Sequence, residues 1–114
     1  MPIHSENDPF SLISGLQSGD KKTFAVIYQT YSKDIFIKLI KLVKSDKIAE
    51  ELLQELFIKL WLKKETIDIQ TNLPGYLNRM AANIAFDYFR KASREQKARA
   101  EFIQGVDSTV EQVL

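Results

Sequence analysis

The chain has 114 residues, of which 45% are hydrophobic and 27% charged, and its formal net charge is +1. This length suits one domain, and this composition is typical of a globular protein rather than a disordered one. The absence of cysteine excludes disulfide bonds, thiolate metal ligands and a cysteine nucleophile. Residues 1–10 lack the pattern of a signal peptide and no apolar run is long enough to span a bilayer, so we expect a cytoplasmic protein without membrane insertion.

Apolar residues recur every three or four positions, and the chain has only four glycines and three prolines. This pattern predicts an all-α fold, a compact bundle of about four helices with a long C-terminal helix. We expect helices over residues 9–17, 21–44 and 47–64, and a fourth that starts after Asn72 and ends near residue 101. Asp20, Ser45 or Asp46, and Asn72 are the expected N-caps. Residues 65–74 form a polar loop in this prediction.

These helices define the expected domain organisation. Residues 1–8 are predicted to be a flexible N-terminus and residues 9–101 the helical domain. Residues 102–114 are acidic and sparsely apolar, which is typical of a linker or a frayed short helix.

Each long helix carries a stripe of apolar residues that predicts its core side. On the second helix the stripe contains Phe24, Ile27, Tyr28, Tyr31, Ile35, Leu39, Leu42 and Val43. On the third helix it contains Ala49, Leu52, Leu53, Leu56, Phe57 and Leu60. On the fourth helix it contains Leu77, Met80, Ala81, Ile84, Tyr88 and Ala92.

The outward side of the third helix is not wholly polar. Ile58 and Leu62 lie there among Glu51, Gln54 and Glu55. An exposed apolar patch with a charged rim marks a protein partner more often than an accident, so we favour a docking surface. The alternative is a wide apolar face that wraps further round a small bundle.

The polar side of the fourth helix is basic. Arginines and an asparagine recur along it, and an aromatic residue lies at its border: Arg79, Asn83, Phe86, Arg90 and Arg94. Residues 79–99 hold six basic residues against two acidic ones, whereas residues 100–114 hold three acids and no base. Guanidinium groups bind phosphate and an exposed aromatic ring can stack on an unpaired base, which predicts single-strand binding. The alternative is an ordinary solvated basic face, and the helical wheel does not separate the two.

The sequence offers no enzymatic site. His4 is the only histidine, and no glycine-rich phosphate loop, nucleophile elbow or paired-histidine metal motif is present. We expect no catalytic residue, no metal and no cofactor.

Three runs of the chain resemble one known family. Residues 49–61 read AEELLQELFIKLW and resemble AEDLVQEVFLRLW, the signature of region 2 of sigma-70 factors in the extracytoplasmic-function (ECF) branch. Residues 73–90 read LPGYLNRMAANIAFDYFR and are similar to LRAWLLRIARNLALDYLR of that branch, and residues 24–31 look like its AFEELYRRY. The three runs share the order and spacing of the family over about residues 12–99.

The resemblance implies a bacterial transcription initiation factor. Such a domain docks on the β′ clamp helices of the RNA polymerase core, recognises the minus-ten promoter element and helps to melt the DNA. The implied polymerase-binding residues are Glu51, Gln54, Glu55, Ile58 and Leu62. The loop before the last helix captures a flipped base of the non-template strand in this family, which implies roles for Asp68, Gln70, Thr71 and Asn72. The last helix supplies further contacts to promoter DNA, carried over here to Arg79, Asn83, Phe86, Arg90 and Arg94.

Two features depart from the family pattern. The chain stops at Leu114, in what the resemblance implies is a linker toward a region 4 domain that is absent here. Ala82 stands where the family commonly has an arginine, which removes one expected phosphate contact. An anti-sigma factor that covers these surfaces is a further implied partner.

Two other functions stay open from the residues alone. One is a helical protein–protein adaptor that uses the Ile58 and Leu62 face and does not bind DNA. The other is a helix-turn-helix protein that reads duplex DNA, although the long fourth helix and the absence of a short recognition turn disfavour it.

Overall fold

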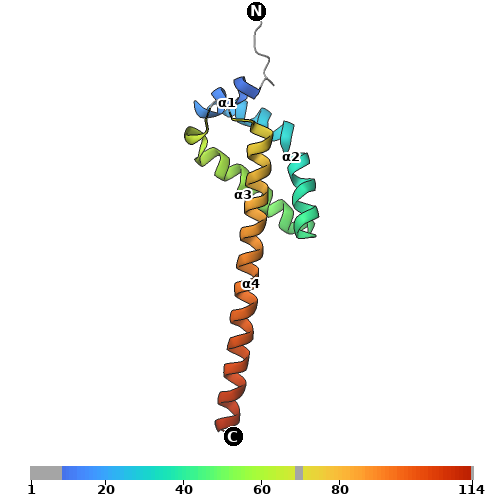
Figure 1. Cartoon of the computed structure of the whole chain (residues 1–114), viewed down its shortest axis with the longest axis vertical. Helices are drawn as coiled ribbons and strands as arrows, with labels where there is room; N and C mark the ends of the chain where they lie inside the picture. Colours follow the sequence, from blue (N-terminus) through green and yellow to red (C-terminus); the bar gives the residue numbers. More distant parts are fainter. Residues whose placement is uncertain (1–8, 69–70, 114) are drawn as a thin grey trace, which may run out of the picture.

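The structure, a computed structural model, describes residues 9–68 and 71–113. Within these residues the elements are α1 (Pro9–Gln17), α2 (Lys21–Val43), α3 (Asp46–Leu62), a 3-10 turn η1 (Lys64–Thr66) and α4 (Leu73–Val113) (Figure 1). The helical bundle predicted from the sequence is confirmed, and the predicted bounds of the first three helices hold to within two residues at each end.

Side chains cap the helices at the predicted positions. The Asp20 carboxylate accepts hydrogen bonds from the Lys22 backbone N–H (3.1 Å) and from the Thr23 hydroxyl (2.7 Å). These two bonds, the Thr23 bond foremost, lower the pKa of Asp20 from its ordinary value because they stabilise the charged form. Ser45, rather than Asp46, caps α3 through the Ile48 N–H (3.2 Å).

The hydrophobic core lies where α1, α2, α3 and the first half of α4 meet. Every predicted core residue of α3 is buried, with no more than 7% of any of them exposed. In α4 the buried residues end at Ala85, which the predicted stripe did not include. Two predicted core residues of α2 are wrong: Tyr28 is 43% exposed and Leu42 is 39% exposed. The apolar stripe of α2 is wider than the surfaces of α3 and α4 that cover it.

The connection between α3 and α4 is less polar than predicted. It begins with η1, and the side chain of Ile67, which follows η1, is buried with only 3% exposed. The Gln17 side-chain amide at the end of α1 donates a hydrogen bond to the Ile67 carbonyl. These contacts fix the start of the loop to α1.

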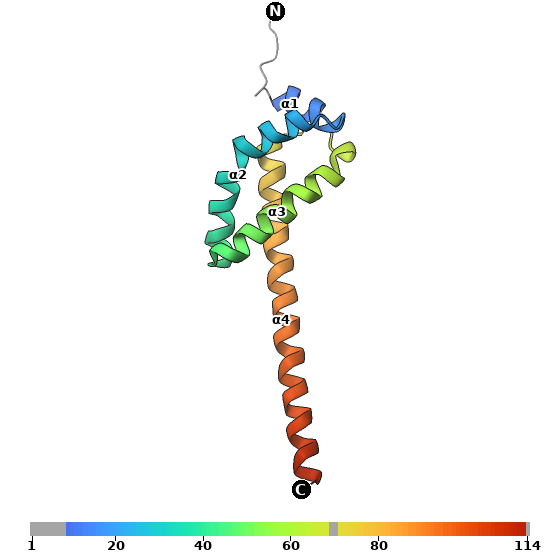
Figure 2. The same cartoon turned by 180° about the vertical axis from the view of Figure 1, so that it is seen from behind.

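Helix α4 is longer than predicted. It does not end near residue 101 but continues to Val113, and its C-terminal half projects beyond the other helices in both views (Figures 1 and 2). The molecule therefore measures 84 × 25 × 20 Å. Side chains from residue 93 to residue 113 are exposed because no described element covers this half. Gly105 costs the helix about 1 kcal/mol relative to alanine, which does not interrupt it. Within the described residues, no helix is both long and apolar enough to cross a membrane.

Candidate functional site

Helix α3 exposes the side that the sequence singled out. Ile58 is 60% exposed and Leu62 is 74% exposed. The three polar residues predicted to surround them, Glu51, Gln54 and Glu55, are exposed as well. At 100° per residue these five positions lie within about 100° of the helix circumference. The structure therefore brings together all five residues predicted to bind a protein partner. We call this surface the outer face of α3.

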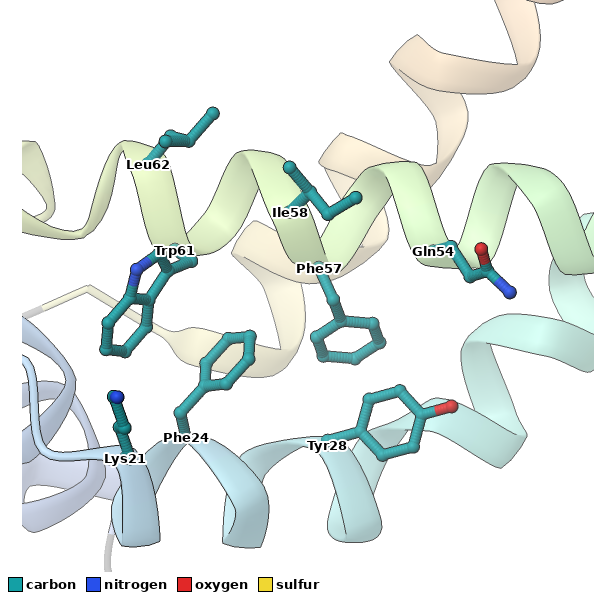
Figure 3. Close-up of a pocket in the computed structure, with 8 residues that line it drawn as sticks. All are labelled: Lys21, Phe24, Tyr28, Gln54, Phe57, Ile58, Trp61 and Leu62. Atoms are coloured by element: carbon teal, nitrogen blue, oxygen red, sulfur yellow. The ribbon is translucent and has the colours of Figure 1, made fainter.

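An aromatic cleft separates α3 from α2 on one flank of the outer face. The Phe24 ring packs edge-on against the rings of Phe57 and Trp61, with centroids 6.2 and 5.0 Å away, and the Tyr28 ring lies 4.8 Å from Phe57. Figure 3 shows these rings between the two helices, and Gln54, Ile58 and Leu62 of the outer face of α3 line the same cleft. The cleft has a volume of about 610 Å³. Tyr28 is exposed because it lies at the open edge of this cleft.

A lysine lies over the indole ring of Trp61. The Lys64 ammonium lies 4.2 Å from the centroid of the Trp61 ring and donates a hydrogen bond to the Trp61 carbonyl (3.2 Å). A cation over an indole face is attracted by the electrons of the ring. Lys64 is thus held on the α2 flank of α3.

The predicted basic row of α4 also lies on one side of its helix. Arg79, Asn83, Phe86, Arg90 and Arg94 are all exposed. At 100° per residue they fall within about 80° of the circumference, along roughly 22 Å of the axis. Phe86 is 63% exposed, so this aromatic side chain does not pack in the core. Asp87 accepts a hydrogen bond from the Arg90 guanidinium and so orients it.

A second, more polar cleft lies between α3 and α4, on the opposite flank of α3 from the aromatic cleft. It has a volume of about 460 Å³. From α4 it is lined by Met80, Asn83, Ile84, Phe86, Asp87 and Arg90, and on the other side by Lys59 of α3 and by Lys63, the C-cap residue that follows α3. The sequence prediction missed these two lysines. Their i, i+4 spacing was the available signal, because it places both on the side of α3 that faces away from Trp61.

Of the four loop residues predicted to bind a base, the structure describes Asp68, Thr71 and Asn72. Asp68 is exposed and its carbonyl accepts a hydrogen bond from the Thr71 N–H (2.9 Å). Asn72 is exposed, and its side-chain oxygen accepts from the Gly75 N–H (3.0 Å), so it caps α4 as predicted. Gln70 lies outside the described residues.

Potential metal ligands do not gather in the part of the chain that the structure describes. No group of three or more histidine, cysteine, aspartate or glutamate side chains is close enough there to hold an ion. His4 lies outside the described residues.

Comparison with known proteins decides the family. Residues 27–95, more than half of the chain, match the family described as Sigma-70 region 2. The chain belongs to this family. The matched segment contains all of α3 and the basic row of α4, so both candidate surfaces of this region 2 domain lie within it.

The relatives of this region 2 domain are ECF sigma factors. It is 32% identical over 71 residues to the ECF RNA polymerase sigma factor SigX of Bacillus subtilis, which covers 62% of this chain and 37% of SigX. It is 33% identical over 73 residues to SigM of the same organism, which covers 64% of this chain and 44% of SigM. The predicted resemblance to ECF region 2 is therefore confirmed, and the chain spans less than half the length of these relatives.

A solved structure shares the fold. It is an NMR structure of an engineered region 2 of sigmaE in complex with GTAAAA, and it superposes with a TM-score of 0.72 at 25% sequence identity. The superposition covers 82% of this chain and 97% of that one. The helical arrangement of this region 2 domain is thus that of a domain solved with a bound oligonucleotide.

Proposed function

We propose that this region 2 domain acts in transcription initiation, binding RNA polymerase through one helix and promoter DNA through another. The observation that carries the proposal is the separation of two exposed surfaces on adjacent helices. The outer face of α3 is apolar with an acidic rim, and the row on α4 is basic with an exposed aromatic ring. These are the features of a protein interface and of a nucleic-acid surface respectively.

The outer face of α3 is the proposed docking site for the β′ clamp helices of the core enzyme. Ile58 and Leu62 would be buried on docking, and burial of exposed apolar surface is the main driving force for such contacts. Glu51, Gln54 and Glu55 form the polar rim that sets orientation and excludes other partners.

The basic row of α4 and the loop before it are the proposed DNA surface for the minus-ten element. Arg79, Arg90 and Arg94 bind phosphates, which fixes the register of the DNA without reading its sequence. Asn83 can donate to and accept from a base edge. The loop residues Asp68, Gln70, Thr71 and Asn72 are the proposed site for a flipped base of the non-template strand, which the resemblance implies.

Strand separation would follow from differential binding. Unstacking a base costs a few kcal/mol, and stacking on an aromatic ring such as Phe86 returns about 1–3 kcal/mol per base. That return is available only when the base has left the duplex, so the domain favours the open strands. No nucleotide hydrolysis and no catalytic residue is needed. We place this activity in the cytoplasm, with an anti-sigma factor that covers these surfaces as a further proposed partner.

The test measures both partners of the full 114-residue chain. Fluorescence anisotropy gives its affinity for a β′ clamp-helix peptide, and then for a labelled strand containing GTAAAA in single-stranded and duplex form, with and without core polymerase. We expect clamp-helix binding and a preference for the single strand. Clamp-helix binding without DNA binding at any salt concentration would instead identify a protein–protein adaptor. A preference for the duplex would identify a duplex reader.

A further inference from the structure

The cleft between α3 and α4 brings lysines from the C-terminal end of α3 to the proposed nucleic-acid surface of α4. Lys59 and Lys63 line the same cavity as Asn83, Phe86 and Arg90. Its volume of about 460 Å³ is within the usual range of small-molecule sites. An exposed aromatic ring, an amide and several cations therefore converge from two helices on one space.

The cationic side chains of this cleft differ in the ion pairs that they form. Arg90 is paired with Asp87 within α4. Lys59 lies 3.3 Å from Glu55, but both side chains are more than one-third exposed, so this pair is worth under about 1 kcal/mol. Lys63 forms no ion pair with any residue that the structure describes. The lysines can therefore exchange solvent or a weak partner for a phosphate at little cost.

We propose that the α3–α4 cleft is a nucleotide site in which Lys59 and Lys63 bind the phosphate of a single-stranded DNA unit whose base lies against Phe86. Helix α3 then serves both partners, polymerase on its outer face and DNA on the lysine flank. The inference rests on the proposed function, because it extends the DNA surface from α4 onto α3. It adds two contacts that neither the helical wheel of α4 nor the family resemblance assigned.

The size of the effect follows from counterion release. On single-stranded DNA, the logarithm of affinity falls with the logarithm of salt concentration by about 0.7 per phosphate contact. At 0.1 M salt each contact therefore contributes about fivefold. We expect the double variant Lys59→Ala/Lys63→Ala to bind a random-sequence 12-nucleotide single strand about 25-fold more weakly, with a salt slope shallower by about 1.4.

Lys64→Ala is the matched control. It removes the same charge one residue away from Lys63, but its ammonium lies over Trp61 on the opposite flank of α3. We expect its DNA affinity and salt slope to equal those of the parent chain. Lys63→Arg, which keeps the charge, should retain the parent affinity to within about twofold. Thermal melting of each variant checks that the fold is intact.

The possible outcomes distinguish failure of the lysine site from failure of the proposed DNA surface of α4. If the parent binds the strand and the double variant binds equally well with an unchanged slope, the lysine site is refuted and the α4 surface stands. If Lys64→Ala weakens binding by the fivefold expected for one cleft lysine, the effect is one of net charge and the site is also refuted. If the parent itself shows no single-strand binding, the proposed function fails at its DNA surface.

Discussion

The docking proposal can be tested by replacing leucine with alanine at two positions of α3, Leu56 and Leu62. Leu56 is fully buried and Leu62 is 74% exposed. Complete burial of a leucine side chain is worth about 1.5–3 kcal/mol, so the buried quarter of Leu62 supports the isolated domain by only about 0.4–0.8 kcal/mol. Leu56→Ala, which leaves a cavity, should lower the free energy of unfolding by about 2–5 kcal/mol.

The exposed fraction of Leu62 also predicts how much affinity for polymerase is lost. If docking buries the exposed three-quarters of Leu62, that surface contributes about 1–2 kcal/mol to the complex, which corresponds to about 5–30-fold in affinity. Leu62→Ala should therefore weaken binding of the β′ clamp-helix peptide by this factor and leave urea denaturation nearly unchanged. Isothermal titration calorimetry gives the affinity. Parent-like affinity in Leu62→Ala, or a stability loss as large as that of Leu56→Ala, would show that the outer face of α3 is not a docking surface.

Three further predictions concern the fold that holds these surfaces. A methyl group on Gly15 would lie 2.4 Å from the Thr23 hydroxyl, so Gly15→Ala should lower the free energy of unfolding by about 1–3 kcal/mol in urea denaturation. Lys44 ends α2 with φ of 59°, a left-handed conformation that favours glycine, so Lys44→Gly should raise the melting temperature by a few degrees. Because the pKa of Asp20 is lowered from 3.8 in the folded state, its charged cap stabilises the protein above that pH and loses this effect as the pH falls through the folded pKa. The stability difference between the parent and Asp20→Asn, followed by thermal melting, should therefore shrink in acid.

Local patterns in the sequence predicted most of the fold. The six core residues of α3 are consecutive members of one helical stripe, and each is buried. The caps at Asp20 and Ser45 depend on hydrogen bonds that span two or three residues. Such features need no knowledge of which helix packs where, and this is why the wheel of α3 also identified Ile58 and Leu62 as exposed.

Features that depend on neighbouring helices were not predictable in this way. Tyr28 belongs to the apolar stripe of α2, but it lines the open aromatic cleft between α2 and α3 and is therefore exposed. Lys59 and Lys63 join the basic surface only because α3 also packs against α4. The end of α4 was wrong for another reason: the apolar residues of its last turns, Phe102, Ile103, Val106, Val110 and Val113, recur at helical spacing but stay exposed, and the sequence prediction looked for helices that bury such a stripe.

The two surfaces of α3 should act almost independently, because among the residues that the structure describes one exposed ion pair is the electrostatic contact between them. Glu55 belongs to the outer face and Lys59 to the lysine flank, and their side chains are 49% and 39% exposed. Such a pair couples two sites by under about 1 kcal/mol, or about fivefold. Leu62→Ala should therefore leave single-strand affinity unchanged, and Lys63→Ala should leave clamp-helix affinity unchanged, both by fluorescence anisotropy. Only variants of Glu55 or Lys59 should alter both affinities, and by no more than about fivefold. A larger cross-effect from Leu62 or Lys63 would mean that polymerase and DNA compete for one surface, which contradicts the separation on which the proposed function rests.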